Sequence, residues 1–338
     1  MYGRRSRRDR FNPRSDGSGL MSHDEFKETT VVVTGSGHGL GEDFARRFAA
    51  LGANVVVNDI ALEPDSDQRS ADRVRDDIIA AGGRAVASYD SVGDPDGARS
   101  IIRTASDAFG GVDVLVNNAA VIRQALFEDV DLEHLDAMID VNLRGTVLVT
   151  QAAYASMRAS GHGRIISLSS GAALFGMRGQ VAYAAAKAGL VGMTKVLAIE
   201  GRDHGVTANV VLPSAATRKG RTKIDWTREV RKTIVPRLRA ELVTPLVVHL
   251  ARRDCKESGE IYSAVAGRYA RSVVGVGDGW LAPQGWTGDE SLSDHWAEID
   301  DISSLGVPTS LESEFALVAE QIWRRDGLPS SLTDSPPS

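Results

Sequence analysis

A tyrosine and a lysine in the segment VAYAAAKAGL have the types and the spacing needed for proton transfer. Tyr183 and Lys187 are four residues apart, so a helix would place both side chains on one face. A phenol, with a reference pKa of about 10, is a poor base at neutral pH. A nearby ammonium favours the phenolate and lowers that pKa. We therefore expect the pair to exchange a proton with an alcohol while hydride moves to or from a nicotinamide.

Ser170 is the third residue with candidate chemistry. It follows the predicted strand 164–168 and lies thirteen residues before Tyr183, so its hydroxyl could hold the reacting oxygen. A tyrosine and a lysine at this spacing are usually structural. The catalytic interpretation therefore depends on a cofactor site elsewhere in the chain.

The segment TGSGHGLG predicts that cofactor site. It lies between the β-branched run Val31–Val33 and the helical pattern 42–51. Its glycines allow a tight turn and a close approach of a diphosphate to the backbone, and the following helix N-terminus offers free N–H groups and the positive end of a dipole. The candidate cofactor contacts are Gly35, Ser36, Gly37, His38, Gly39, Leu40 and Gly41.

Asp59 indicates which dinucleotide would bind. It ends the next predicted strand, 24 residues after Gly35, where a carboxylate accepts hydrogen bonds from the adenosine ribose hydroxyls. It would repel a ribose 2′-phosphate, and neither arginine nor lysine follows at Ile60 or Ala61. His38 stands where a phosphate-seeking cation could sit. This pattern favours NAD over NADP as the cofactor.

The elements that must position these residues alternate between two patterns. Short runs that are apolar on both faces alternate with amphipathic helices, which is typical of a parallel sheet covered on both sides. We predict an α/β, Rossmann-like, doubly wound parallel sheet of about seven strands with a C-terminal extension. The predicted strands are 31–33, 53–58, 84–88, 112–116, 164–168, 207–212 and 259–265, and the predicted helices are 42–51, 68–81, 95–109, 132–158, 180–203, 291–301 and 311–324.

Composition and charge exclude several classes of protein. The 338 residues carry a net charge of -6, and an acidic body argues against a nucleic-acid-binding core. The single cysteine, Cys255, excludes a disulfide framework and a multi-cysteine metal site, so we expect no metal. No uninterrupted apolar stretch approaches the length of a membrane span, and no secretory signal follows the N-terminal arginines. We expect a cytoplasmic protein.

The chain divides into four predicted segments. Residues 1–27 form a basic and disordered N-terminal segment, because six arginines face two aspartates in residues 1–20 and apolar content is low. This segment could touch an acidic surface or nucleic acid, or residues 1–20 could be an extension of the reading frame upstream of Met21. We predict a catalytic domain at 28–266, an extension with short helices at 267–325 and a disordered tail at 326–338.

These motifs, in this order, resemble the short-chain dehydrogenases/reductases over about residues 28–266. The resemblance rests on the glycine-rich turn, Asp59, Asp90, the NNAA segment from Asn117, and the set Asn142, Ser170, Tyr183 and Lys187. It implies that Tyr183 is the catalytic acid/base. Lys187 would bind the nicotinamide ribose and tune the tyrosine, Ser170 would orient the substrate oxygen, and Asn142 would hold a water in a proton relay.

The same resemblance implies further cofactor contacts. Asp90 with Ser91 or Val92 would line the adenine pocket, Asn117 and Ala119 would lie beside the cofactor, and Pro213 and Thr217 would approach the carboxamide. Structural alternatives stay open: Asn117 and Asn118 could serve the backbone of their own turn, and Asn142 could bend its helix.

Two departures from the family pattern occur. Ser214 stands where the family usually has glycine after Pro213, and the NNAG of the family reads NNAA here. Ser214 lacks the freedom of glycine, so the loop 213–217 could approach the carboxamide differently.

Several segments resemble, more narrowly, the dehydrogenase part of the type two peroxisomal multifunctional enzymes of β-oxidation. This likeness implies NAD-dependent oxidation of a (3R)-3-hydroxyacyl-CoA by a free-standing, bacterial-type relative. A hydroxysteroid or another bulky secondary alcohol is the alternative substrate, and a non-catalytic NAD-binding scaffold or sensor is a third interpretation. The segments are VVVNDIA, 87–92, LRGTVLVTQAAYASM, LAIEGRDHGVTANVVLPSAATR, 243–247, 255–259 and the tryptophans 280, 286 and 296.

A basic segment fits an acyl-CoA substrate. Residues 218–239 hold nine basic residues, opposed by Asp225 and Glu229, and CoA phosphates need cationic partners. A solvated helix face is the alternative. Family members pair through the helices predicted at 132–158 and 180–203, so we also expect a homodimer or homotetramer. The basic residues are Arg218, Lys219, Arg221, Lys223, Arg228, Arg231, Lys232, Arg237 and Arg239.

Overall fold

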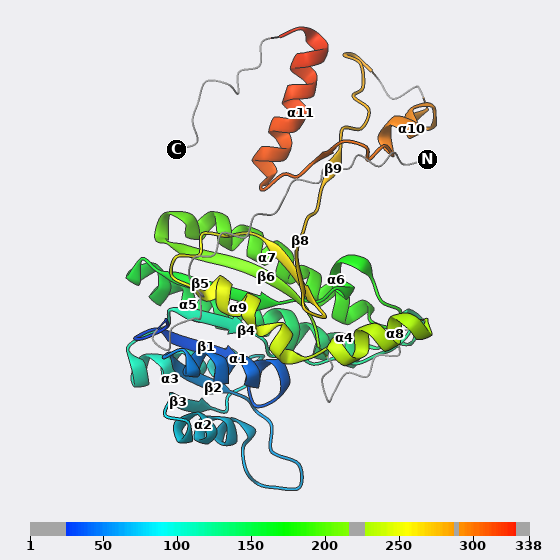
Figure 1. Cartoon of the computed structure of the whole chain (residues 1–338). Coiled ribbons are helices and arrows are strands. Elements are labelled where there is room, and N and C mark those ends of the chain that lie inside the picture. Colours follow the sequence, from blue (N-terminus) through cyan, green and yellow to red (C-terminus); the bar gives the residue numbers. More distant parts are fainter. Residues whose placement is uncertain (1–24, 216–226, 287–290, 329–338) are drawn as a thin grey trace, which may run out of the picture.

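The computed structural model describes residues 25–215, 227–286 and 291–328. Its centre is an eight-stranded sheet in the order β3-β2-β1-β4-β5-β6-β7-β8, with helices on both faces (Figure 1). Strands β1 to β7 are parallel and β8 is antiparallel to β7. The strand order reverses between β1 and β4, and such a switch point is where open α/β sheets bind ligands. The predicted fold class is confirmed.

The element bounds follow the predicted alternation. The sheet strands are β1 Thr30–Thr34, β2 Asn54–Asn58, β3 Arg84–Ser88, β4 Val114–Asn117, β5 Gly163–Leu168, β6 Val206–Ser214, β7 Ile261–Val265 and β8 Arg268–Ser272. The α-helices of the sheet domain are α1 Gly39–Ala50, α2 Ser70–Ala80, α3 Pro95–Phe109, α4 Leu132–Ile139, α5 Thr146–Ser160, α6 Ala172–Phe175, α7 Val181–Gly201, α8 Arg228–Ile234 and α9 Thr244–Ala251. The short helices are η1 Phe127–Asp129, the π-helix η2 Asp140–Gly145, η3 Arg202–His204, η4 Val235–Arg237 and η5 Ala240–Leu242.

The valines of β1 show why helices cover both faces of the sheet. Successive side chains of a strand point to opposite faces. Val31 and Val33 belong to the core cluster that contains Phe44 of α1. Val32 belongs to the cluster on the other face, which contains Ile101 of α3. A run of three buried valines therefore serves two cores, one on each side of the sheet.

The eighth strand corrects the predicted number of seven. β8 pairs with β7 through a two-residue turn, Ala266-Gly267, in which both residues have positive φ (53° and 84°). That geometry is the type I′ turn of a tight hairpin. The sequence RYARS of β8 is mostly exposed, so it lacks the buried apolar pattern that identifies the other strands.

The core includes a residue before position 28, the predicted start of the catalytic domain. Phe26 is 2% exposed and its ring meets that of Phe48 edge-on, with centroids 5.2 Å apart. Its backbone N–H donates to the carbonyl of Leu51 (2.9 Å). The residues just before β1 therefore close the end of the core over α1. Residues 1–24 and 329–338 of the predicted termini lie outside the described residues.

The predicted continuous helix 132–158 is interrupted. α4 and α5 are joined by the π-helix η2. The Asn142 amide donates to the carbonyl of Met138, four residues back (2.9 Å), and to that of Val121 on a separate loop (2.9 Å). A side chain that competes for backbone groups in this way is a recognised cause of local unwinding.

One helix is long and apolar enough to cross a membrane when length and composition alone are considered. This stretch, Val181–His204, comprises α7 and η3. α7 packs against β6 and α4, and the side chain of its residue Lys187 is buried. We interpret it as the central helix of the sheet domain.

The C-terminal extension is a small layer beyond β8. Figure 1 shows α10 and α11 standing away from the sheet. Trp280 is stacked on His295 (centroids 3.9 Å apart) and meets Trp286 edge-on. The elements are β9 Val276–Gly277, η6 Leu292–His295, α10 Trp296–Ile299, β10 Leu305–Gly306 and α11 Leu311–Asp326, with β9 and β10 paired antiparallel.

Candidate active site

The carboxyl ends of the parallel strands bring the predicted site residues to one edge of the sheet. Thr34 ends β1, Asn58 ends β2 and Asn117 ends β4. Leu168 ends β5, two residues before Ser170, and Ser214 ends β6. Parallel strands place these ends side by side, so the glycine-rich turn and Ser170 share one edge with the switch point.

Lys187 is fixed between α7 and the end of β5. Its side chain is 1% exposed, and its Nζ donates to the carbonyl of Leu168 (2.8 Å). The Ser169 hydroxyl in turn donates to the carbonyl of Lys187 (2.7 Å). The Lys187 Nζ lies 5.9 Å from the centroid of the Tyr183 ring. Four-residue spacing therefore does place both groups on the same side of α7.

Burial lowers the pKa of Lys187 to about 7. An ammonium prefers water, so enclosing it favours the neutral amine. The carbonyl of Leu168 is the hydrogen-bond partner that the described part of the chain provides. Lys187 therefore keeps donors for a ligand and can change charge near neutral pH.

The Tyr183 pKa differs from the sequence expectation. We expected the Lys187 ammonium to lower it. Burial instead raises the pKa of the phenol above its usual value, and the opposing influence is a hydrogen bond with Ser170. Ser170 also accepts from the Ala172 N–H (3.1 Å), which fixes its hydroxyl at the start of α6. Burial therefore keeps Tyr183 protonated at neutral pH, and the Ser170 hydrogen bond opposes that shift.

The glycine-rich turn is packed so closely that side chains cannot replace two of its glycines. A Cβ on Gly35, whose φ is +63°, would lie 2.7 Å from the Cα of Ala119. A Cβ on Gly41 would lie 2.4 Å from the carbonyl oxygen of Gly35. α1 starts directly after His38, which provides no side-chain cap. The first N–H groups of α1, from Gly39 onward, thus suit a diphosphate.

Ser36, a predicted cofactor contact, has its hydroxyl and N–H engaged inside the protein. It is fully buried, and its hydroxyl donates to the carbonyl of Val33 (2.8 Å). Its N–H donates to the carbonyl of Asn58 (2.8 Å). Both polar groups that could meet a cofactor are used inside the protein, so Ser36 shapes the turn instead.

Asp59 lies directly under the glycine-rich turn. Its two carboxylate oxygens accept from the N–H groups of Gly37 and Ala61 (both 2.9 Å). A Cβ on Gly37 would lie 2.8 Å from Asp59 Oδ2, which explains glycine there. The carboxylate is therefore held at the end of β2, where the ribose hydroxyls of a dinucleotide are bound in this type of fold.

Asn58 is a site residue that sequence reasoning missed. Its N–H donates to the Ser36 hydroxyl (3.0 Å), and its amide donates to the carbonyl of Asp90 (2.9 Å). It thus joins the glycine-rich turn to the loop after β3. A polar residue that ends a buried valine run was the available signal. Of the two predicted neighbours of Asp90, Val92 is buried in the core and Ser91 is half-buried.

The residues after β4 support the turn more than they face a ligand. The Asn117 amide donates to the Thr150 hydroxyl of α5 (2.9 Å). Asn118 donates from its amide to the carbonyl of Gly35 (2.9 Å). The N–H groups of Asn118 and Ala119 donate to the Thr34 hydroxyl (3.0 and 3.1 Å). Asn117 therefore reaches α5 and Asn118 reaches the glycine-rich turn, whereas the structural alternative placed both contacts on the backbone of their own turn.

Asn142 connects the π-helix to the loop after β4. Its Oδ1 accepts from the Val121 N–H (3.2 Å), while its amide nitrogen donates to the carbonyls of Val121 and Met138. The side chain is fully buried and its hydrogen-bonding groups are used. Both amide hydrogens and the amide oxygen are thus engaged within the protein, and the relay role of Asn142 stays a prediction.

The Pro213-Ser214 departure has a simple explanation. Both residues belong to β6 and pair with Ala264 and Val265 of β7. Ser214 is not among the non-glycine residues with positive φ, so its conformation does not require glycine. Thr217, with the basic residues up to Lys223, lies outside the described residues.

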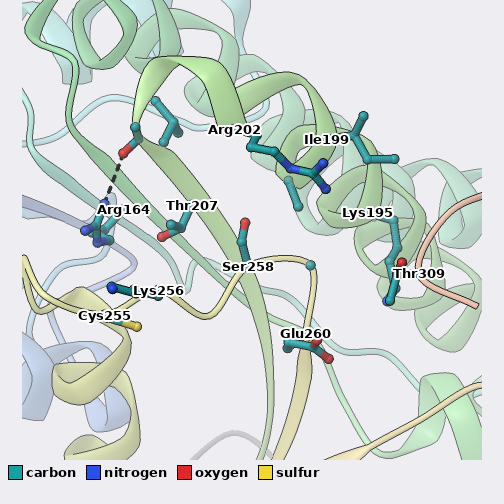
Figure 2. A pocket seen from close by; sticks show the side chains of 14 residues that line it. Arg164, Lys195, Ile199, Arg202, Thr207, Cys255, Lys256, Ser258, Glu260 and Thr309 are labelled. Carbon is teal, nitrogen blue, oxygen red and sulfur yellow. Dashed lines mark hydrogen bonds between the residues drawn. The ribbon is translucent and has the colours of Figure 1, made fainter. Parts of the chain in front are cut away.

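A cavity of about 430 Å³ lies at the other edge of the sheet (Figure 2). It is lined by Val206 and Thr207 at the start of β6 and by the end of α7. Figure 2 also shows Arg164, which donates to the carbonyl of Gly205 (3.2 Å). Because Tyr183 does not line it, this cavity is separate from the candidate active site.

One described cluster has metal-ligating side chains. The ligand atoms of His249, Cys255 and Glu257 lie within 4.8 Å of one another. The Cys255 thiol donates to Glu257 (3.0 Å), and burial raises the pKa of the thiol to about 11. A protonated thiol is a poor metal ligand, so we interpret the cluster as a hydrogen-bonded pair beside a histidine.

Comparison with known proteins agrees with this arrangement. The family model of the short chain dehydrogenases matches residues 29–228. The chain is 35% identical to peroxisomal multifunctional enzyme A of Dictyostelium discoideum over 320 residues, which are 92% of this chain and 69% of that protein. It is 38% identical to a short-chain type dehydrogenase/reductase of Mycobacterium tuberculosis, over 82% of this chain and 96% of that protein. The full-length peroxisomal multifunctional enzyme type 2 of Drosophila melanogaster superposes with a TM-score of 0.73 at 29% identity, over 89% of this chain and 50% of that chain.

Proposed function

Because the chain belongs to the short-chain dehydrogenase family, we propose that it oxidises the 3-hydroxyl of a (3R)-3-hydroxyacyl-CoA to a ketone with NAD. The observation that carries the proposal is the Tyr183, Ser170 and Lys187 arrangement at the edge that also holds the glycine-rich turn. A nicotinamide dinucleotide supplies hydride transfer. The glycine-rich turn, the start of α1 and Asp59 would hold it.

The side chains divide the proton chemistry among them. Ser170 and the Tyr183 phenol share a hydrogen bond, so a substrate oxygen that binds both would be oriented at the Tyr183 oxygen. Tyr183 gives a proton to the oxygen in reduction and takes it in oxidation. Lys187, with donors to spare beyond Leu168, would bind ribose hydroxyls. Its positive charge would then favour the phenolate.

The preference for NAD over NADP is supported by Asp59. Its carboxylate is anchored by two backbone N–H groups at the end of β2. A 2′-phosphate placed there would meet a fixed negative charge, whereas a 2′-hydroxyl would meet an acceptor.

The acyl-CoA substrate is supported by relatives and by local surface. The relatives named peroxisomal multifunctional enzymes match most of this chain. α8, which follows the carboxyl end of β6, exposes Arg228, Arg231 and Lys232. Phe175 of α6, five residues after Ser170, is also exposed. A cationic helix and an apolar side chain suit a ligand with phosphates and an acyl chain.

A homodimer or homotetramer is part of the proposal. The outer faces of α5 and α7 expose Val147, Val196 and Ile199. Apolar side chains exposed on two neighbouring helices are typical of a surface that a second copy covers.

The decisive experiment measures NAD reduction with a panel of alcohols. The panel holds 3-hydroxyacyl-CoAs of both configurations and free hydroxysteroids. We expect the (3R)-thioesters to give the highest kcat/KM. A higher kcat/KM for a hydroxysteroid would replace the proposed substrate.

Tyr183→Phe provides the test of mechanism in the same panel. Loss of the phenol should abolish NADH formation, because no other group described here can exchange the proton with the substrate oxygen. NAD binding, measured by calorimetry, should stay near normal. Turnover that persists in the variant would refute the role of Tyr183.

A further inference from the structure

Glu63 lies beside the glycine-rich turn and contacts the side chains of Arg73 and His38 there. It belongs to the loop after β2, which is closed by a bridge between Leu62 and Arg69 and by the Glu63 N–H to the carbonyl of Gln68 (2.9 Å). The Glu63 side chain is 17% exposed. Its Oε1 accepts from Arg73 Nε (2.7 Å) and lies 4.0 Å from His38 Nε2.

Arg73 comes from α2 and is held on three sides. Its Nε donates to Glu63, and its two terminal nitrogens donate to the two carboxylate oxygens of Glu42 (both 2.9 Å). One terminal nitrogen, Nη2, also donates to the carbonyl of Gly37 (2.8 Å). These contacts raise the pKa of Arg73, chiefly through the Glu42 hydrogen bond. A guanidinium has five N–H donors, and four are engaged here.

Gly37 joins this cation to the ribose-binding carboxylate. Its N–H donates to Asp59 and its carbonyl accepts from Arg73. Arg73 and Asp59 therefore flank one residue of the turn. A phosphate on the ribose 2′-oxygen, next to Asp59, would come within the range of Arg73 and His38 if their charges were free.

We propose that Glu63 is a specificity-determining residue for the adenosine end of the cofactor: it engages Arg73 and His38 and withholds them from a 2′-phosphate. This inference rests on the proposed use of NAD. Asp59 repels the phosphate, and Glu63, together with Glu42, engages the Arg73 guanidinium that could compensate. The network of Glu42, Glu63, Asp59 and Arg73 carries more negative than positive charge, which disfavours a doubly charged phosphate.

The test uses nucleotide fragments that need no turnover. Calorimetry at fixed ionic strength would measure Kd for 5′-AMP and for adenosine 2′,5′-bisphosphate with the whole chain. Glu63→Gln keeps the shape of the side chain and removes its charge. We expect Kd for the bisphosphate to fall about 10-fold, the size of a charge-assisted hydrogen bond gained, while Kd for 5′-AMP changes less than twofold.

Two further variants separate the mechanism from general charge effects. Asp76→Asn removes a carboxylate of the same helix α2 that pairs with Arg75, away from the turn, and should leave both Kd values unchanged. In Glu63→Gln/Arg73→Ala, most of the gained bisphosphate affinity should be lost. A full gain that persists without Arg73, an equal gain in Asp76→Asn, or no gain in Glu63→Gln would overturn the proposal.

The same titrations distinguish the two proposals. If the wild-type chain binds adenosine 2′,5′-bisphosphate more tightly than 5′-AMP, the proposed NAD preference fails. If NAD is preferred but Glu63→Gln does not change the discrimination between the two fragments, then the role of Glu63 alone fails.

Discussion

At the scale of a single residue, Lys187 is a charged side chain whose burial lowers the stability of the fold. It is enclosed by the protein, and a backbone carbonyl is the partner that the described residues give to its charge. A side chain that lowers stability yet lies beside the reacting tyrosine is typical of a functional site. The same burial gives a measurable link between stability and pH.

Lys187→Met should stabilise the fold near neutral pH. The pKa of Lys187 is about 7 in the folded chain and about 10.4 in an unfolded one. Between those values the unfolded state binds the extra proton, so wild-type stability rises with pH from 7 to 10.4. The variant lacks this slope and should gain roughly 2–4 kcal/mol at pH 7.

Urea unfolding at pH 7 and pH 9.5 measures the effect. Lys256→Met, at an exposed position, serves as the control and should keep the wild-type slope. A Lys187→Met chain with the wild-type slope would contradict the assigned pKa.

Ser170→Ala should shift the pH profile of alcohol oxidation to higher pH. Oxidation needs the deprotonated form of Tyr183, so the rate rises as the phenol ionises. The Ser170 hydrogen bond lowers the pKa of that phenol, and its loss raises the pKa further. The measurement is kcat/KM for oxidation against pH.

Ser170→Thr keeps a hydroxyl and should restore the wild-type profile. If Ser170→Ala lowers the rate at every pH without shifting the profile along the pH axis, Ser170 only orients the substrate and does not act on Tyr183.

At the scale of elements, the sequence predicted the strands and helices whose formation depends on local residue patterns. Valine runs gave β1 and β2, and the apolar periodicity gave α3 with its bounds at 95 and 109. The break at η2 was predicted only as the alternative that Asn142 could bend its helix, and the local contact with Met138 agrees with it. The second contact, with the carbonyl of Val121 on a separate loop, was not predicted. β8 was missed because its residues are exposed and its pairing follows from a hairpin turn.

Gly41→Ala tests the packing of α1 against the turn. The new methyl would lie 2.4 Å from the Gly35 carbonyl oxygen and 2.5 Å from the amide nitrogen of Asn118, so the backbone must shift. We expect a loss of about 1–3 kcal/mol of stability together with weaker binding of 5′-AMP. Thermal unfolding and calorimetry measure the two effects.

Gly192→Ala is the matched control. Gly192 is an exposed residue of α7 with open space where its Cβ would lie, and alanine should stabilise that helix by up to about 1 kcal/mol. Similar effects of both substitutions would show that the turn is less tightly packed than described.

At the scale of the whole molecule, the site could be predicted only in part. Tyr183, Lys187, Ser170 and Asp59 were predicted because each follows a local motif or ends a strand. Glu63 and Arg73 act through tertiary contacts, such as that of Arg73 with Gly37, and no local pattern indicates them. Asn58 also acts through distant partners, and its only local signal is its place at the end of a buried valine run. Charge placement, by contrast, was visible in the sequence as a basic segment in an acidic chain.

Charge reversal on α8 tests that segment. Replacing Arg228, Arg231 and Lys232 with glutamate should raise KM for an acyl-CoA at least 10-fold at low salt, because long-range attraction to phosphates is lost. KM for the matching N-acetylcysteamine thioester, which has no phosphates, should change less than twofold. Equal effects on both thioesters would show that α8 is a solvated face without a role in CoA binding.

Arg164 gives the fold a dependence on the order in which the chain is made. Its guanidinium is buried, and it donates to the carbonyls of Gly163 and Gly205 and to those of Arg252 and Arg253 after α9. Its charge is therefore accommodated only when residues 252–253 are in place. During synthesis from the N-terminus, we therefore expect β5 to reach its final packing only after the ribosome has released the segment after α9. The packing of the central strand β5 thus depends on residues from the C-terminal third of the chain.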